Sequence, residues 1–316
     1  MKKGILAAFI ILGFILLPVN QVYAQPHWHA NTHTIETPDL VVRFFNRQPQ
    51  YIFWVPGENE TAVYIVKFHE IIEFIDEDGD GALSPGDDIL SRSMLLESDV
   101  NWKISAETLS GPNNSTEIRI TMSALVPVYK TAMDGGRIGY VNVTFINHIY
   151  DRDVEVEGYI VEGNKELKID IIIENWPWIN SESKLALGII FAGHFRGKHG
   201  VPHMEHHRVK EKVKEVKMRG EDAPYSGAFR YREEVKLCEK EGERIGSVHA
   251  TEEFSMHEAI LYLVYPHFEG ILIHDPSITV IKPESTILEV LTNVYFLVAL
   301  AGIIILGTVI VVTRKK

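Results

Sequence analysis

The feature that most constrains the fold of this chain is an alternation of apolar and polar residues with a period of two. In the segment 165–176, KELKIDIIIENW, leucine or isoleucine occupies every second position from 167 to 173. The segment 137–150, RIGYVNVTFINHIY, alternates in the same way. Successive side chains of a β-strand point to opposite faces of a sheet, so this period predicts strands with one buried face. Roughly eight to twelve such strands, and few helices, are expected.

Strands with one apolar face bury that face most simply against a second sheet, so the sequence predicts an all-β fold of the β-sandwich type. The segment NWPW at 175–178 is expected to form a sheet corner, because Pro177 cannot continue a strand ladder. Trp176 and Trp178 are interpreted as cover for the edge of the core, and a platform that stacks against sugar rings is the alternative. The single cysteine, Cys238, excludes an intramolecular disulfide bond.

The amino-terminal segment 1–24 has the pattern of a secretory signal peptide. Two lysines precede an uncharged apolar run, and Val22 and Ala24 are the small or apolar residues that a cleavage site requires. The mature chain is then expected to begin at Gln25. The alternative is an uncleaved amino-terminal anchor.

The carboxyl-terminal segment predicts a transmembrane helix. Residues 290–313 carry no charge, and a basic tail, residues 314–316, follows at once. At about 1.5 Å per residue the uncharged run is about 36 Å long, enough for a hydrocarbon core of about 30 Å. The basic tail belongs on the cytoplasmic side. We therefore expect a cell-membrane protein with a transmembrane helix over residues 288–313 and a β-rich extracellular domain over residues 25–284.

The charge of the chain argues against nucleic acid as a partner. All 43 acidic residues lie between residues 25 and 289, together with 26 of the 31 basic residues. A surface this acidic repels nucleic acid and attracts cations. The expected partners are the membrane, through the one helix, and an extracellular ligand or surface protein. Sequons for N-glycosylation, which are compatible with a glycoprotein that faces the outside, occur at Asn59, Asn113, Asn114 and Asn142.

One short stretch, DEDGDGALSPGD at residues 76–87, interrupts an otherwise apolar region with acidic residues. Asp76, Asp78 and Asp80 occupy alternate positions, and Asp87 ends the stretch. Four carboxylates held this close repel one another unless a cation neutralises them. Calcium takes six to eight oxygen ligands, and a coiled loop of twelve residues supplies them from alternate side chains.

This stretch resembles the calcium loops of the EF-hand and dockerin families, over residues 76–87 only. Gly81 stands at the sharp turn of such a loop, and an aspartate at the last position is the dockerin-like variant. Pro85 and Gly86, before that last position, depart from the pattern. The ligands that the resemblance implies are the side chains of Asp76, Asp78 and Asp80, the carbonyl of Ala82, Ser84 through a water, and Asp87.

The residues before this loop favour a strand over a helix. The segment 61–75, TAVYIVKFHEIIEFI, is rich in β-branched residues. A strand would make the loop part of a calcium-clamped hairpin, in which the ion is a structural staple and not a switch. Two alternatives stay open: an incoming helix with Phe68, Ile71, Ile72 and Ile75 on one face, and a solvated acidic turn without an ion.

Histidines form a second candidate metal site. The chain has 14 of them, and five fall within residues 193–207, GHFRGKHGVPHMEHH. Neutral imidazole binds Cu, Zn and Ni, so an extracellular transition-metal site is a rival to calcium. On a helix His203 and His207 would share one face, but Gly200 and Pro202 oppose a long helix there. The ligands of this rival site would be His194, His199, His203, His206 and His207.

Residues 200–222 change composition sharply and become highly charged. We expect an insertion or a projecting hairpin here, with a short helix as the alternative, because Val209, Val213 and Val216 are spaced by four and three residues.

Signatures of enzymes are missing from the sequence: it has no Gly-x-Ser-x-Gly nucleophile, phosphate-binding loop or dinucleotide fingerprint. The favoured function is therefore that of a membrane-anchored, calcium-binding cell-surface protein with a binding or structural role in adhesion or envelope assembly. The alternatives are an extracellular protein that binds Cu, Zn or Ni and a surface module that binds or cleaves carbohydrate.

Overall fold

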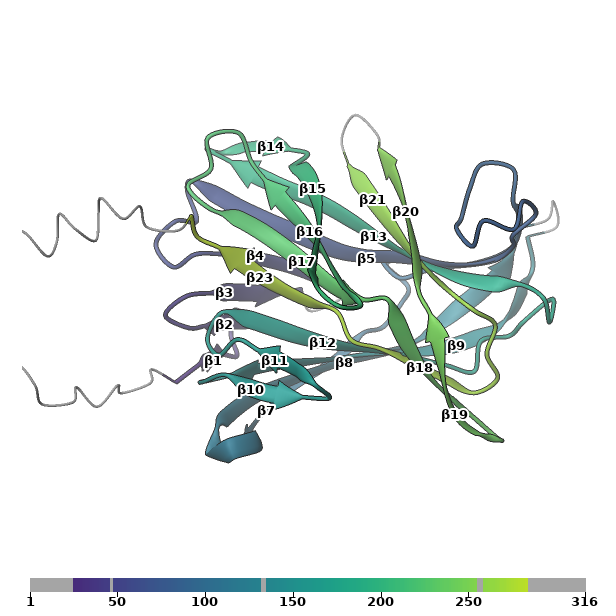
Figure 1. Ribbon diagram of the computed structural model, residues 1–316, viewed down its shortest axis with the longest axis horizontal. Coiled ribbons are helices and arrows are strands. Elements are labelled where there is room, and N and C mark those ends of the chain that lie inside the picture. The colour runs from purple at the N-terminus through teal and green to yellow at the C-terminus, as the bar shows by residue number, and fades with distance from the viewer. Residues whose placement is uncertain (1–24, 46–47, 132–134, 255–257, 284–316) are drawn as a thin grey trace, which may run out of the picture.

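The computed structural model describes residues 25–45, 48–131, 135–254 and 258–283, and it confirms the all-β prediction. These residues form 23 strands, and the only helix among them is the single 3-10 turn Pro112–Asn114. Neighbouring strands pair in antiparallel fashion throughout, as in β8 with β9 and β5 with β13. The pairings arrange the strands in two layers, which lie face to face (Figure 1).

The first layer is built around the long strand β5, which pairs with β4 and β13. Near its end β5 also pairs with β6, which continues to β8 of the other layer and so joins the two. The strands of this layer are β1 (His27–His29), β2 (Thr34–Glu36), β3 (Val41–Phe44), β4 (Gln50–Trp54), β5 (Ala62–Ile75), β6 (Asp88–Met94), β13 (Lys184–Phe195), β14 (Lys198–Gly200), β20 (His249–Phe254) and β21 (Ala259–Tyr265).

The second layer is built around β8, β9 and β12, and the far edge of β12 pairs with both β22 and β23. Its strands are β7 (Lys103–Ser110), β8 (Thr116–Lys130), β9 (Arg137–Tyr150), β12 (Glu166–Glu174), β15 (His203–Lys210), β16 (Val213–Arg219), β17 (Ser226–Arg232), β18 (Glu234–Glu239), β19 (Gly242–Ser247), β22 (Ile271–His274) and β23 (Ser277–Ile281). A separate small hairpin consists of β10 (Val154–Val156) and β11 (Tyr159–Val161).

The core lies between the layers, as the alternation predicts. Phe68 of β5 contacts Phe145 of β9 with ring centroids 4.7 Å apart. Phe191 of β13 contacts Phe229 of β17 at 5.5 Å. Every second residue of β12, from Leu167 to Ile173, is fully buried in the same cluster. The residues between them face away from the core, so the period of two correctly separated the inner from the outer face of these strands.

The NWPW segment connects the two layers, since it follows β12 of the second layer and precedes β13 of the first. A fully buried carboxylate, Glu73 of β5, holds this corner in place. It accepts hydrogen bonds from the indole of Trp176 (3.3 Å), the Ile179 amide (2.8 Å) and the Ser183 hydroxyl (2.8 Å). The Asn180 amide and the Ser91 hydroxyl complete its set of donors. Neutral hydrogen-bond donors of the protein thus take the place of water around the buried carboxylate of Glu73.

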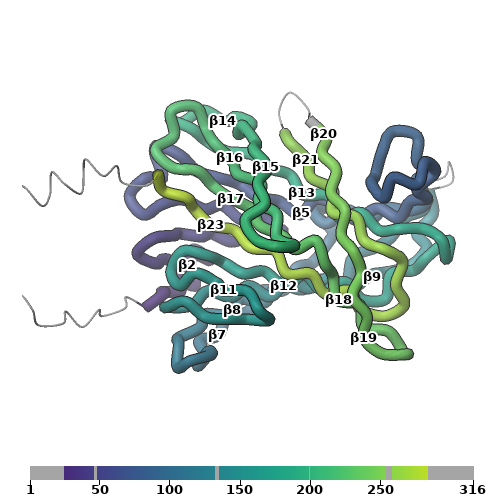
Figure 2. Tube along the Cα trace, viewed as in Figure 1, coloured from purple at the N-terminus to yellow at the C-terminus, as the bar shows by residue number. Residues whose placement is uncertain are grey.

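Residues 203–219 form the β15–β16 hairpin, so the short helix considered for this segment is not formed. Within the described ranges, no helix has the length and apolar character needed to cross a membrane. The predicted signal peptide (residues 1–24), transmembrane helix (288–313) and cytoplasmic tail (314–316) lie outside the described residues. The first described strand, β1, begins on the same side of the molecule on which the last, β23, ends (Figure 2).

Candidate calcium-binding loop

The acidic loop, residues 76–87, is the whole connection between two paired strands. β5 ends at Ile75 and β6 begins at Asp88, and these two residues are register partners. The interpretation of residues 61–75 as a strand is therefore confirmed, and the loop closes a hairpin. Gly81 and Gly86 have φ angles of 85° and 118°, which side chains with a Cβ rarely adopt, so the coiling of the loop depends on glycine.

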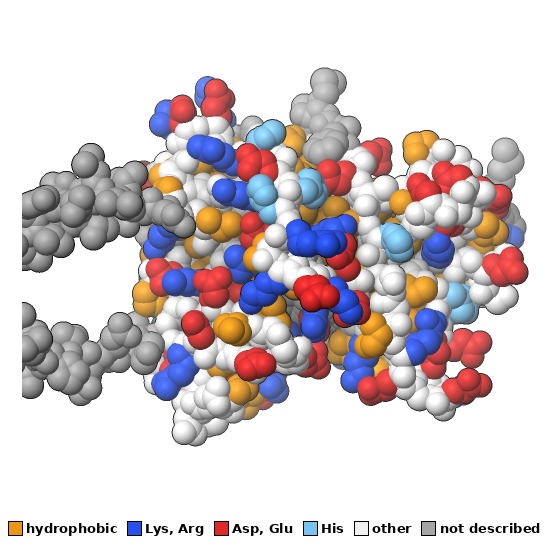
Figure 3. Space-filling model, in the orientation of Figure 1, with side chains coloured by type: hydrophobic (Ala, Val, Ile, Leu, Met, Phe, Trp, Pro, Cys, Tyr) orange, Lys and Arg blue, Asp and Glu red, His pale blue; other side chains and the backbone are white. Residues whose placement is uncertain are grey.

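The aspartates shape this loop by accepting hydrogen bonds from its own amides. The two carboxylate oxygens of Asp76 accept from Gly79 and Gly81, each at 2.9 Å. Asp78 accepts from the amide of Asp80 (3.1 Å), and Asp80 accepts from the amide of Ala82 (2.7 Å). As a result, oxygens of Asp76, Asp78 and Asp80 lie within 4.8 Å of one another. Figure 3 shows acidic side chains gathered over this loop.

One cation of the protein already touches this group. The ammonium of Lys184 on β13 lies 2.5 Å from Oδ2 of Asp76, whose side chain is only 6% exposed. The hydrogen bond from Lys184 lowers the pKa of Asp76, with smaller contributions from the Gly79 and Gly81 amides. Asp78 and Asp80 have no such partner among the described cations and are exposed to solvent. The charge of the loop is thus neutralised at one edge only.

The remaining predicted ligands are placed less favourably. Asp87 uses Oδ1 to accept from the Glu77 amide (3.1 Å) and Oδ2 to accept from the Ser84 amide (2.7 Å). The Ser84 hydroxyl lies 3.3 Å from oxygens of both Asp78 and Asp87, so it connects the two. The structure therefore brings three of the four aspartates into one group and uses the fourth to close the loop.

The loop is fixed onto the first layer through β20. The amide of Leu83 donates to the hydroxyl of Thr251 at 3.2 Å, and the side chain of Leu83 packs on a small cluster with Ile72 and Tyr262. Gly81 lies against the ring of His249, so that a Cβ at Gly81 would come within 3.2 Å of the imidazole. A loop attached at these points suits a structural staple better than a moving switch.

The donor set of the loop fits a hard cation. It consists of carboxylate and hydroxyl oxygens and contains no nitrogen or sulfur ligand, which is the chemistry that calcium and magnesium prefer. Asp76, Asp78 and Asp80 would hold such an ion, with Ser84 beside them.

The predicted histidine ligands whose side chains the structure describes do not, by contrast, gather around one point. The chain at His203, His206 and His207 is a strand, so about 13 Å separate His203 from His207 at about 3.3 Å per residue. His206 pairs with Glu252 of β20 instead. Within the described residues, the acidic loop is the only place where three or more metal-binding side chains each bring a ligand atom within 4.8 Å of the others.

The other two histidines lie on a different pair of strands. His194 of β13 and His199 of β14 are register partners. The placement of the His199 side chain lies outside what the structure describes. In Figure 3 the histidines of this face lie at several separate places, some near β15 and others farther to the right.

The two tryptophans of the corner are engaged inside the protein. Trp176 belongs to the core and is 5% exposed, so it is not available to stack on a sugar. The indole of Trp178 donates to the carbonyl of Phe268 (2.8 Å), and its ring lies 4.1 Å from that of His267. Their packing role, which the sequence favoured over a sugar platform, agrees with these contacts.

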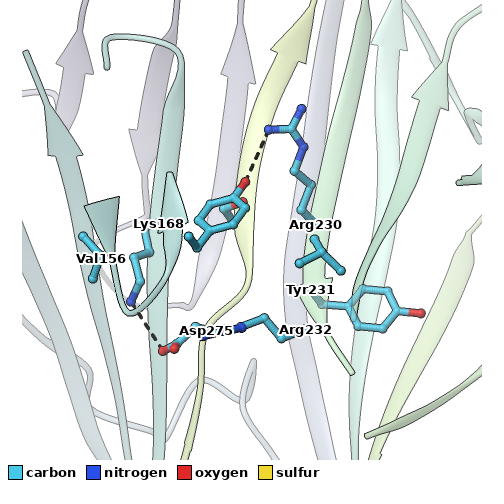
Figure 4. Close-up of a pocket in the computed structure, with 9 residues that line it drawn as sticks. Val156, Lys168, Arg230, Tyr231, Arg232 and Asp275 are labelled. Atoms are coloured by element: carbon cyan, nitrogen blue, oxygen red, sulfur yellow. Dashed lines mark hydrogen bonds and ion pairs between the residues drawn. The ribbon is translucent and has the colours of Figure 1, made fainter. Parts of the chain in front are cut away.

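Sequence reasoning missed a second concentration of charge, which we call the Lys168 cluster: Glu117, His148, Lys168, Asp170 and Asp275. His148 lies 2.8 Å from Glu117 and 3.1 Å from Asp170, and Lys168 bridges Asp170 and Asp275. Figure 4 shows Lys168 and Asp275 beside a cavity of about 10 Å³, room for one water molecule. Lys168 and Asp275 are 107 residues apart, so no local pattern announces their pairing.

Burial and charge act on these groups in opposite directions. Burial raises the pKa of Asp275 to about 6. Asp170 is buried as well, but hydrogen bonding by His148 and the charge of Lys168 overcome burial and lower its pKa to about 2. Burial alone would lower the pKa of His148, yet its bonds to Asp170 and Glu117 raise it. The acids of the Lys168 cluster thus have their counterions, His148 and Lys168, within the protein.

Comparison with known proteins gives no family. No family model matches the chain, and no curated protein is similar to it. Among solved structures, a putative kojibiose phosphorylase from the human microbiome is similar with a TM-score of 0.31 and 9% sequence identity. The match covers 82% of this chain and 32% of that protein, so this chain spans about a third of its length. So weak a likeness assigns neither a fold family nor an activity.

Proposed function

We propose that this chain is a membrane-anchored, calcium-binding cell-surface protein with a binding or structural role, in adhesion or in assembly of the cell envelope. The observation that carries the proposal is the acidic loop, in which oxygens of Asp76, Asp78 and Asp80 lie within 4.8 Å of one another at the tip of a hairpin. Three carboxylates at this distance have one ammonium, that of Lys184, to neutralise them. A divalent cation would remove the remaining repulsion.

The placement outside the cell is supported by the patterns at the two ends of the sequence. A signal peptide over residues 1–24 and a transmembrane helix over residues 288–313 would leave a β-sandwich ectodomain between them. The described chain starts and ends on one side of the molecule, and the acidic loop lies at the opposite end (Figure 1). The loop would then face away from the membrane.

An extracellular calcium site of this kind acts as a staple. Extracellular calcium modules bind with a Kd of about 10⁻⁴ to 10⁻³ M, weakly enough to need only the calcium of the surrounding medium. At about 1 mM calcium and a Kd of about 10⁻⁴ M, binding stabilises the folded state by about 1.4 kcal/mol. The hydrogen bond from the Leu83 amide to Thr251 of β20 would transmit this stabilisation to the first layer.

The test is calcium binding by the full-length protein, purified in detergent and freed of metal with a chelator. We expect isothermal titration with calcium chloride to show about one ion per chain and the midpoint of thermal unfolding to rise by about 3–5 °C. The double variant Asp78→Asn/Asp80→Asn should lose both effects, because the two side chains keep their shape and lose their charge.

Asp88→Asn is the matched control, because Asp88 is exposed, follows the loop directly and begins β6. This variant should bind calcium like the parent. The proposal fails if the parent takes up no calcium at about 10 mM, a concentration above the whole expected range of Kd, or if the double variant takes up as much as the parent.

A further inference from the structure

A second part of the molecule presents polar groups to a ligand: the outer face of β7, β8, β9 and β12. The register places cross-strand neighbours in rows on this face. One row contains Lys103, Ser123 and Thr144, which are successive partners. The next row contains Leu125, Asn142 and Glu174, which are also successive partners. The side chains of both rows point away from the core, because the residues between them on the same strands are buried.

These rows line a hollow of about 540 Å³, within the range of ligand-binding pockets. We call it the polar hollow, and its polar side chains are those of Asn101, Lys103, Ser123, Asn142, Thr144 and Glu174. Within the described part of the chain, none of the six side chains has a hydrogen-bond or ion-pair partner. Lys103 and Glu174 cannot neutralise each other, because two strands lie between theirs and neighbouring strands are about 4.8 Å apart.

The other end of the same face shows that this sheet can pair its polar groups. There Arg119 contacts Glu107 at 3.4 Å and Glu117 at 2.9 Å, and His148 and Lys168 are bound to acids as described above. The polar hollow is therefore a local feature and not a general property of this face. Its amides, hydroxyls and two opposite charges leave a full set of donors and acceptors directed to the outside.

The chemistry of the polar hollow selects a neutral ligand rich in hydroxyl groups. Amide and hydroxyl side chains donate and accept equally well, as a sugar hydroxyl does. Lys103 would repel a cationic ligand and Glu174 an anionic one. Apolar surface for the C–H faces of sugar rings is supplied on the same face by Leu125 (56% exposed) and Tyr140 (42% exposed).

We propose that the polar hollow binds a neutral polysaccharide chain laid across β7, β8, β9 and β12. This inference rests on the proposed function only in that such a polymer would be met outside the cell. It does not involve the acidic loop, so calcium binding and polysaccharide binding succeed or fail separately.

The test uses the full-length protein in detergent, made in a host that does not attach N-linked glycans, because Asn142 lies in a sequon. Electrophoresis through gels that contain mannan, dextran or xylan should retard the protein in at least one of them. Polygalacturonate, an anionic polymer, should retard it less. The double variant Asn142→Leu/Thr144→Val removes hydrogen-bonding groups while it keeps the number and branching of the side-chain heavy atoms, and it should weaken the binding by about tenfold.

Thr108→Val on β7 is the matched control, because Thr108 is exposed and does not line the polar hollow. It should bind like the parent. Should the double variant fold poorly, hydrogen–deuterium exchange of the parent decides the matter: the polysaccharide should protect residues 121–126 and 140–146.

Four results would overturn the proposal, and the first three concern the neutral polymers. They are a parent that binds none of the neutral polymers, a folded double variant that binds as tightly as the parent, and protection confined to another part of the chain. Preference for polygalacturonate would overturn it as well, since Lys103 alone would then explain the binding.

Discussion

The acidic loop and the Lys168 cluster both gather carboxylates, and the fold neutralises them in different ways. In the Lys168 cluster, Asp170 and Asp275 share the ammonium of Lys168, whose side chain is 8% exposed. In the acidic loop Lys184 reaches only Asp76, and Asp78 and Asp80 stay exposed. The first region has its counterions built in, whereas the second has room for one from solution.

The difference follows from where the partners lie in the chain. The carboxylates of the acidic loop come from twelve consecutive residues, and any counterion of the protein must approach from outside the loop. The members of the Lys168 cluster come from β8, β9, β12 and the residue after β22, so assembly of the sheet brings acids and bases together. Buried acids need such partners, since an uncompensated charge in the interior is strongly destabilising.

The largest expected effect comes from removing the built-in cation. Lys168→Met leaves Asp170 and Asp275 without it, and breaking a buried pair in this way costs about 3–5 kcal/mol. We expect the midpoint of thermal unfolding to fall by about 2–4 °C for each kcal/mol lost. Lys165→Met is the control, because Lys165 is exposed near the start of the same strand. Equal midpoints for the two variants would show that the cluster does not need its lysine.

Replacing a buried acid that has neutral partners should cost almost as much stability as Lys168→Met. Glu73 is fully buried and accepts hydrogen bonds from five donors, including Ser91, Trp176 and Ser183. In Glu73→Gln an amide group replaces one acceptor oxygen and faces these donors, so we expect a loss of about 2–3 kcal/mol in the free energy of unfolding.

The control for this variant is Glu77→Gln, an exposed residue four positions later in the acidic loop. Urea unfolding curves of the two proteins give the comparison. If the two changes cost the same, the donors around Glu73 do not depend on its charge.

The sequence predicted what is local and missed what is distant. The alternation in residues 137–150 and 165–176 identified the inner and outer faces correctly, because the period of a strand is a property of neighbouring residues. The acidic loop could be predicted for the same reason, because its aspartates are close neighbours in the sequence. Glu73 and Ser183, however, are 110 residues apart, and only the fold brings them together.

The histidine-rich segment shows the opposite error. Its residues are close in sequence, but a strand spreads them out and places neighbours on opposite faces. Among the histidine side chains that the structure describes, a cluster in the sequence therefore did not become a cluster in space. The outward side chains of β9 and β12 were identified by alternation, yet the polar hollow depended on the pairing of four strands and was not predicted.

The pH dependence of stability provides a second test of the Lys168 cluster. The pKa of His148 is raised in the folded state by Asp170 and Glu117, against the effect of burial. Its contribution to stability is therefore fully present below the ordinary pKa of about 6.5 and is lost as the pH rises through the raised value. The stability difference between the parent and His148→Gln should thus be largest near pH 5 and shrink as the pH rises.

The ionisation of Asp275 also lowers the stability of the parent as the pH rises, over part of this range. Burial raises its pKa to about 6, so its ionisation costs stability between about pH 4 and 6 in both proteins. Because this contribution is present in both proteins, most of it cancels when the stability of His148→Gln is subtracted from that of the parent. A stability difference that stays constant from about pH 5 to 9 would contradict the assignment of His148 as the titrating group.

The smallest expected effect is also the one that compares the two regions most directly. It removes Lys184, the one cation among the described residues that contacts the acidic loop. In Lys184→Met the ammonium no longer contacts Asp76, so a calcium ion meets less repulsion, worth about 1 kcal/mol or about fivefold in Kd. Calcium titration of the full-length protein should therefore show tighter binding than the parent, whereas Lys165→Met should leave the affinity unchanged. Weaker binding in Lys184→Met would mean that the lysine positions Asp76 for the ion and does not compete with it. The acidic loop would then depend on the fold for its charge balance as much as the Lys168 cluster does.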